Sequence, residues 1–162
     1  MFQPVLPASG LPGWKLLNST MEAQTRAFDS APRIERDTAY FENKIGDVTS
    51  AEDLVSDRRL LRVALGAFGL GEDIDNRFFI RKVLESPPND RGALANALSD
   101  SRYSQLNEAF GFGDARAGPR TAESGFGAEI TAKFRERSFE VAVGRQDESL
   151  RLALNATREL GE

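Results

Sequence analysis

A segment that occurs twice, about 43 residues apart, constrains the fold of this chain more than any other feature. Its copies are Ser56–Gly71 and Ser99–Gly113, offset by 43 residues at the start and 42 at the end. Each begins with a Ser-Asp pair, continues with apolar residues at helical spacing and ends in Phe-Gly-x-Gly. Because short polar side chains cap the start of a helix and glycine ends one, each copy is expected to form one capped helix. A partial third copy, Leu150–Ala156, lacks the Phe-Gly ending. The alternative is a chance similarity between common helix caps.

The rest of the chain also shows helical spacing. Apolar residues recur every three or four positions over 13–28, 34–45, 126–143 and from residue 147 onward, and no convincing period-2 strand is present. The expected fold class is therefore all-α, a compact multi-helix bundle containing a degenerate helical repeat of about 43 residues, since so few copies favour a bundle over a solenoid. The side chains expected on buried helix faces include Leu61, Phe68, Phe78, Phe79, Val83, Leu84, Leu106, Phe110, Val141, Leu150, Leu154 and Leu160.

The length and composition indicate one globular domain over residues 1–162. A chain of 162 residues buries roughly 70% of the surface that its unfolded form exposes, so it folds without disulfides or metals. Its hydrophobic fraction of 40% and charged fraction of 28% exclude disorder of the whole chain. Residues 1–12 contain Pro4, Pro7 and Pro12, which predict an extended arm that packs on the domain or frays.

The charge distribution argues against nucleic acid as a partner. The net charge is −4, with acidic and basic residues interspersed, so the chain has no general basic field for phosphate backbones. Arg58, Arg59 and Arg62 fall within about one helical turn and could form a local anion site. A solvated helix face is the favoured interpretation of these arginines.

The chain contains neither cysteine nor histidine. The first absence excludes disulfides, cysteine nucleophiles and thiolate metal sites, and the second removes the side chain that most readily exchanges protons near neutral pH. We therefore expect no enzyme, no catalytic residues, no metal site and no cofactor.

Three local motifs suggest chemistry but have simpler interpretations. Gly66, Gly69 and Gly71 could cradle a phosphate, but phosphate loops precede a helix and these glycines end one. The segment Glu72–Asn76 is rich in oxygen ligands, yet it lacks the glycine and glutamate spacing of a calcium loop, so acidic helix-start residues are the better interpretation. The pair Glu52 and Asp53 could act as two acids in a hydrolase, although 25 acidic residues make such pairs inevitable.

Five blocks of the sequence carry a resemblance to a known family. They lie at 37–41, 53–61, 67–70, 79–86 and 139–144 with 150–154, and the resemblance covers about residues 35–160. On these blocks the chain resembles a bacterial family of domains of unknown function that is often encoded among flagellar genes. The family has no established catalytic or binding residues, so no site follows. The resemblance implies an association with flagellar assembly or motility.

These observations favour a non-enzymatic protein–protein interaction domain, a flagellum-associated structural or assembly factor whose protein partner is a flagellar component. The alternative is a small-molecule-binding regulator or enzyme with a pocket between helices, lined by some of the eleven phenylalanines. The chain has no secretory signal pattern and no run of 18 uncharged apolar residues, so we expect a cytoplasmic protein without a membrane span. Export through the flagellar machinery remains an alternative.

Overall fold

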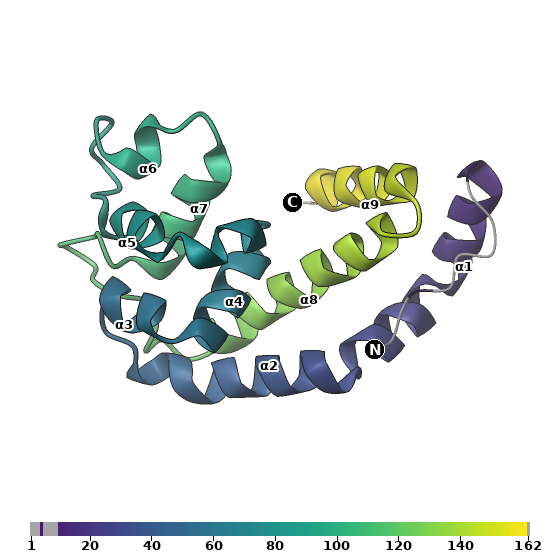
Figure 1. The fold of residues 1–162 in the computed structure, drawn as a ribbon, viewed down its shortest axis with the longest axis horizontal. Coiled ribbons are helices and arrows are strands. Elements are labelled where there is room, and N and C mark those ends of the chain that lie inside the picture. The colour runs from purple at the N-terminus through teal and green to yellow at the C-terminus, as the bar shows by residue number, and fades with distance from the viewer. Residues whose placement is uncertain (1–3, 5–9, 162) are drawn as a thin grey trace. The chain divides into compact units, whose positions relative to one another are not determined.

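The computed structural model describes residue 4 and residues 10–161, and all regular elements in that part of the chain are helical (Figure 1). This confirms the predicted all-α fold of packed helices. Among the same residues, no helix is both long and apolar enough to cross a bilayer. The elements in chain order are α1 (Gly10–Asp29), α2 (Pro32–Lys44), η1 (Ile45–Asp47), α3 (Ala51–Ser56), α4 (Arg58–Ala67), η2 (Gly71–Asp75), α5 (Arg77–Glu85), α6 (Leu94–Ala97), α7 (Ser101–Phe110), α8 (Phe126–Gly144) and α9 (Glu148–Gly161).

The helices form two compact units. The central unit comprises residues 37–134, and the terminal unit comprises residues 1–36 together with 135–162. The unit boundaries fall within α2 and α8. The sequence predicts one domain over residues 1–162, and this stays a prediction. Two compact units can unfold together or separately, and the contacts within each unit do not decide between these cases.

Helix α1 begins earlier than the sequence suggested. Residues 1–12 were expected to be extended, but α1 starts at Gly10, so the prediction is wrong for residues 10–12. Pro12 is tolerated there because the first N–H groups of a helix have no intrahelical acceptor. Residues 1–3 and 5–9 lie outside the described part of the chain. Pro4 is buried and its carbonyl oxygen accepts a hydrogen bond from the Gln146 side chain.

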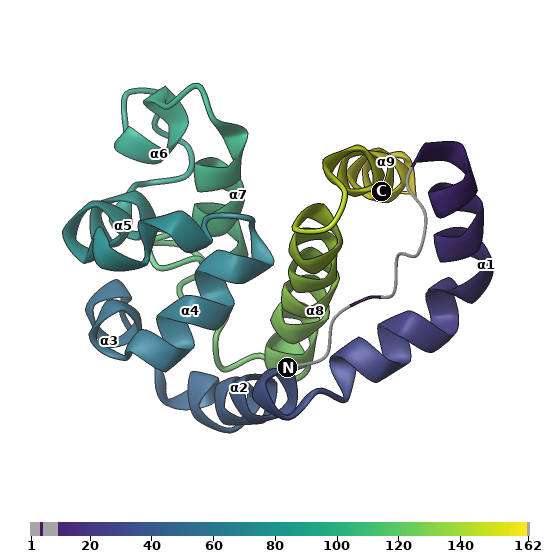
Figure 2. The same cartoon turned by 45° about the vertical axis from the view of Figure 1, so that its right-hand side comes forward.

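Helix α4 forms the middle of the central unit. Its side chains Leu61, Val63, Ala64 and Leu65 are all fully buried. α3, α5 and α7 surround the same core, and Figures 1 and 2 show these short helices grouped around α4. Leu61, Phe68, Leu106 and Phe110, which the pattern placed inside, are each at most 5% exposed.

The terminal unit has a smaller core between α1, α8 and α9. A short turn at Arg145–Asp147 joins α8 to α9, as Figure 2 shows. Phe28 and Phe139 meet edge to face with ring centroids 5.6 Å apart. The buried cluster consists of Leu17, Phe28, Phe139, Val143, Leu150 and Leu154, with Trp14, Met21, Ile34 and Ala142 partly buried against it.

Three apolar side chains expected inside are on the surface. Phe78 is 63% exposed, Val141 44% and Leu160 89%. In α5, Ile80 and Val83 define the buried face, and residue 78 falls on the other side of a helix with about 3.6 residues per turn. The prediction was wrong at these positions because an apolar residue near the right spacing need not fall on the face that a neighbour covers.

The two repeat copies share their helix ends. The carboxylate of Asp57 accepts the Arg59 N–H at 3.0 Å at the start of α4, and Asp100 accepts the Arg102 N–H at 3.0 Å at the start of α7. Glycines with positive φ, 74° at Gly69 and 72° at Gly111, follow the two helices. The continuations differ, since η2 and α5 follow α4 whereas turns and α8 follow α7. A repeat of the whole 43-residue unit is therefore not confirmed.

Candidate functional site

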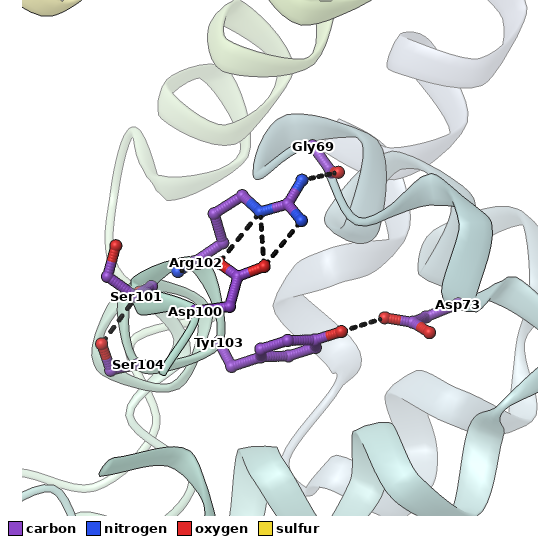
Figure 3. A network of polar contacts seen from close by, with 7 residues as sticks. All are labelled: Gly69, Asp73, Asp100, Ser101, Arg102, Tyr103 and Ser104. Atoms are coloured by element: carbon purple, nitrogen blue, oxygen red, sulfur yellow. Dashed lines mark hydrogen bonds and ion pairs between the residues drawn. The ribbon is translucent and has the colours of Figure 1, made fainter. Parts of the chain in front are cut away.

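A network of polar contacts lies at the start of α7 (Figure 3). Arg102 donates from Nε and Nη2 to the Asp100 carboxylate at 3.0 and 2.7 Å, and from Nη1 to the Gly69 carbonyl oxygen at 2.6 Å. Gly69 follows the end of α4, where carbonyl groups lack intrahelical donors. Arg102 therefore connects the start of α7 to the end of α4.

Tyr103 extends this network to η2. Its hydroxyl donates to the Asp73 carboxylate at 2.7 Å, and this hydrogen bond raises the pKa of Tyr103 to about 12. The Arg102 guanidinium holds the pKa of the Asp100 carboxyl below its usual range. These contacts join α7 to α4 and η2, so the geometry fits a structural tie between helices.

A second Tyr-Asp contact connects α2 to α4. The Tyr40 hydroxyl donates to Asp57 Oδ2 at 2.6 Å, and the Arg59 guanidinium lies 4.0 Å from the centre of the Tyr40 ring. The hydrogen bond to Asp57 raises the pKa of Tyr40. Asp57 thus caps α4 and also binds a side chain from α2.

The three arginines of α4 do not converge on an anion site. Arg58 pairs with Asp75 at 2.8 Å, and Arg62 lies 3.6 Å from the Asp37 carboxylate. Arg59 covers the Tyr40 ring instead. Since each cation has its own partner, the cluster serves local packing on α4.

The acidic motifs are also used locally. Asp73 binds Tyr103 and accepts a hydrogen bond from the Asn76 side chain at 2.9 Å. Glu52 pairs with Arg81 at 2.7 Å, and Asp53 accepts the Thr49 N–H at 3.2 Å beside the predicted Ser50 cap. No group of His, Cys, Asp or Glu among the described residues is arranged to hold a metal ion.

Gly66 has a packing role that the sequence did not reveal. A Cβ atom there would lie 2.7 Å from the Phe134 ring, so the missing side chain lets Phe134 pack directly on α4. Gly69, with φ of 74°, is the glycine that ends the helix. The phosphate-loop alternative is not supported at Gly66, because a phenyl ring occupies the space next to it.

Asn107 is the main polar residue that sequence reasoning missed. It is 2% exposed, and its Nδ2 donates to the carbonyl oxygens of Val83, Leu84 and Ser86 at 2.9, 3.2 and 2.7 Å. These carbonyls end α5, so a side chain from α7 caps that helix. A lone asparagine within an apolar helical pattern is the one signal that marked this position.

An apolar face of α9 in the terminal unit is exposed. Leu152 is 60% and Leu160 is 89% exposed, and Ala156 between them is also exposed. The spacing of four residues places the three side chains in one stripe. We call Leu152, Ala156 and Leu160 the α9 face.

Residues 67–162, more than half of the chain, match a family described as a protein of unknown function, DUF1217. The chain belongs to the DUF1217 family. This agrees with the resemblance to a bacterial domain of unknown function, and the α7 network and the α9 face both lie mostly within the matched residues. No curated protein matches this DUF1217 protein.

A solved structure extends the likeness to the whole chain. The crystal structure of a protein from Agrobacterium tumefaciens matches this DUF1217 protein with a TM-score of 0.82 and 28% sequence identity. The match covers 98% of this chain and 70% of that chain. The same helical fold therefore occurs in a bacterial protein with an additional part.

Proposed function

We propose that this DUF1217 protein is a non-enzymatic protein–protein interaction domain that binds a component of the bacterial flagellum through the α9 face. The observation that carries the proposal is the exposed stripe of Leu152, Ala156 and Leu160. Apolar anchors four residues apart are the pattern by which a helix docks into a groove of its partner. Covering one exposed leucine contributes about 1.5–3 kcal/mol.

The charges beside the α9 face define the partner further. Glu148 and Glu159 are about three helical turns apart and therefore lie on the same flank of the stripe. The other flank, at Ala153 and Thr157, is uncharged. Glu148 pairs with Arg151 at 2.9 Å and Glu159 lies 3.8 Å from Arg158, so both carboxylates already have partners within α9. We therefore expect a groove with an apolar floor and only a weak basic bias along one rim.

The flagellar part of the proposal is supported by the family resemblance, since members of the family are often encoded among flagellar genes. A chain without histidine or cysteine suits an assembly or structural role that needs no cofactor. The expected partner is thus a flagellar component with an accessible groove rather than a small molecule.

Deletion of the gene tests the biological role. We expect loss of swimming or defective filaments, restored by the wild-type gene. Unchanged swimming and filament formation would count against the flagellar role.

A pull-down with purified full chain tests the α9 face. The variant with both Leu152→Ser and Leu160→Ser should lose the flagellar component that the wild-type chain retains. Leu11→Ser is the matched control, because Leu11 is 64% exposed in the same unit but lies on α1. Equal retention by the double variant would show that the α9 face is not the binding surface.

A further inference from the structure

Phe78 is an exposed aromatic residue that the fold does not use. It is 63% exposed at the start of α5, whereas Ile80, Val83 and Leu84 on the same helix are fully buried. Those three side chains complete the face that α5 directs into the core. Phe78 adds little to core packing, so its ring is available for contact with another molecule.

Two cations lie over the Phe78 ring. The Lys82 Nζ atom is 4.7 Å and the Arg81 guanidinium carbon 5.4 Å from the ring centre. Both side chains come from the next helical turn, three and four residues along α5. Such cation–π contacts restrict the ring before any partner arrives, which reduces the entropy lost on binding.

The cations of this surface differ in their partners. Arg81 is occupied by Glu52 at 2.7 Å and Glu85 at 3.6 Å. Arg77 and Lys82 are exposed, and neither pairs with a carboxylate in the part of the chain that the structure describes. Two basic groups on the same helix as the exposed ring thus remain available to a partner.

We propose that Arg77, Phe78 and Lys82, here called the Phe78 patch, bind an acidic protein segment in which an apolar side chain lies next to a carboxylate. The apolar side chain covers the ring, and carboxylates pair with Arg77 and Lys82. This complementary charge identifies the occupant. The patch belongs to the central unit and is independent of the α9 face.

Nucleic acid fits the patch less well. Glu85 and Asp75 are exposed near the same helix, and the net charge of the chain is −4, so a phosphate backbone meets repulsion around a small basic spot. An apolar contact on Phe78 also adds nothing to the neutralisation of phosphates. A peptide with both apolar and acidic groups uses every side chain of the patch.

Selection of displayed random peptides on the full chain tests the proposal. We expect enriched peptides that combine Asp or Glu with a neighbouring Leu, Ile, Phe or Met. Their affinity, measured by fluorescence anisotropy of the labelled peptide, should fall about tenfold in Phe78→Ala and in Arg77→Ala/Lys82→Ala, which corresponds to about 1.4 kcal/mol. Higher salt should weaken binding to the wild-type chain.

Controls separate binding from folding. Leu11→Ala removes an equally exposed apolar side chain elsewhere and should leave peptide affinity unchanged, and each variant should keep the wild-type circular dichroism spectrum. Peptides without an acidic bias, or equal affinity for Phe78→Ala, would overturn the proposal. So would tight binding of a single-stranded oligonucleotide that depends on Arg77 and Lys82, with or without a contribution from Phe78.

Discussion

The central and terminal units differ in how completely they cover their apolar side chains. The central unit surrounds α4 with α3, α5 and α7, and among its described large apolar side chains Phe78 alone is exposed. The terminal unit has a small buried cluster and leaves Leu11, Val141, Leu152 and Leu160 on its surface.

The polar groups of the two units differ in the same way. Asn107 in the central unit is neutral and makes three hydrogen bonds to backbone carbonyls. The terminal unit instead contains an ion pair between Arg158 and Glu140 at 3.0 Å, each side chain 8% exposed. A neutral, satisfied network adds stability at low desolvation cost, whereas a buried ion pair offsets its attraction by desolvation. A bound partner should therefore add more stability to the terminal unit than to the central unit.

Truncation of the central core should have the largest effect. Phe110 is fully buried, and its ring meets that of Phe126 at 5.2 Å, so Phe110→Ala should lower the free energy of unfolding by about 4 kcal/mol. Leu154→Ala, at a 9% exposed site of the terminal unit, should lower it by about 2 kcal/mol. Urea denaturation of the two variants measures both values. A larger loss for Leu154→Ala than for Phe110→Ala would contradict the view that the central unit has the more completely packed core.

The buried ion pair of the terminal unit comes next. Arg158→Ala leaves the Glu140 carboxylate buried without its main partner and should lower the free energy of unfolding by about 3 kcal/mol. Replacing both residues by methionine should be close to neutral, because no unpaired charge remains. If the double variant is as unstable as Arg158→Ala, the pair contributes through packing and not through its charges.

Removal of the Asn107 side chain should have a smaller effect on the central unit. Asn107→Ala leaves the carbonyl oxygens at the end of α5 without their donor and should lower the free energy of unfolding by roughly 2 kcal/mol. Asn89→Ala, at an exposed loop position, is the matched control and should change it by less than about 0.5 kcal/mol. Hydrogen exchange should show faster opening of α5 in the Asn107 variant alone.

The two units should respond differently to pH. Burial raises the pKa of Glu140 above its ordinary 4.5 and that of Asp29 above 3.8, so protonation favours the folded terminal unit. Their stabilisation is complete below the unfolded pKa and is lost as pH rises through the raised values. The protection factors of α8 and α9, which are intrinsic exchange rates divided by the observed rates at the same pH, should therefore rise on acidification from pH 7 toward about 4.5. Glu140→Gln should reduce this change.

The pKa values of two carboxyls in the central unit are lowered, so their effect on stability has the opposite pH dependence. Hydrogen bonds from Thr49 lower the pKa of Asp53, and those from Arg102 lower the pKa of Asp100. Their stabilisation is present above the ordinary value of 3.8 and is lost as pH falls through the lowered values. The protection factors of the central unit should thus fall only in strong acid. Lower central protection factors already at pH 5 would contradict this assignment.

The smallest effect is expected on the α9 face. Leu160→Ser should change the free energy of unfolding by less than about 0.5 kcal/mol, because the side chain is 89% exposed. Thermal denaturation checks this value. A loss comparable to that of Leu154→Ala would mean that Leu160 belongs to the core of the terminal unit.

Local chemistry explains why the helices and their ends could be predicted. Asp57, Asp100 and Asp147 each accept a backbone N–H group from the first turn of α4, α7 and α9. Gly69 ends α4 by a positive φ that other residues rarely adopt. Such signals act over a few residues, so they can be recognised without knowledge of the fold.

Contacts between distant segments could not be predicted in the same way. The partners of Arg58, Arg62 and Tyr103 come from other helices. A run of arginines or acidic residues in the sequence does not indicate which charged side chain will pack against it. The candidate α9 face could not be predicted from the sequence either. Leu154 and Leu160 both fit a helical stripe, but only Leu154 is buried in the folded protein.

The sequence by itself therefore determined an all-helical chain, the approximate ends of its helices and the burial of residues such as Leu61 and Phe110. Only the tertiary structure decided that Asn107 caps α5, that Phe134 needs the gap at Gly66, and that Phe78 stays on the surface. Helix formation depends on neighbours within about one turn, whereas exposure depends on which other helix packs there.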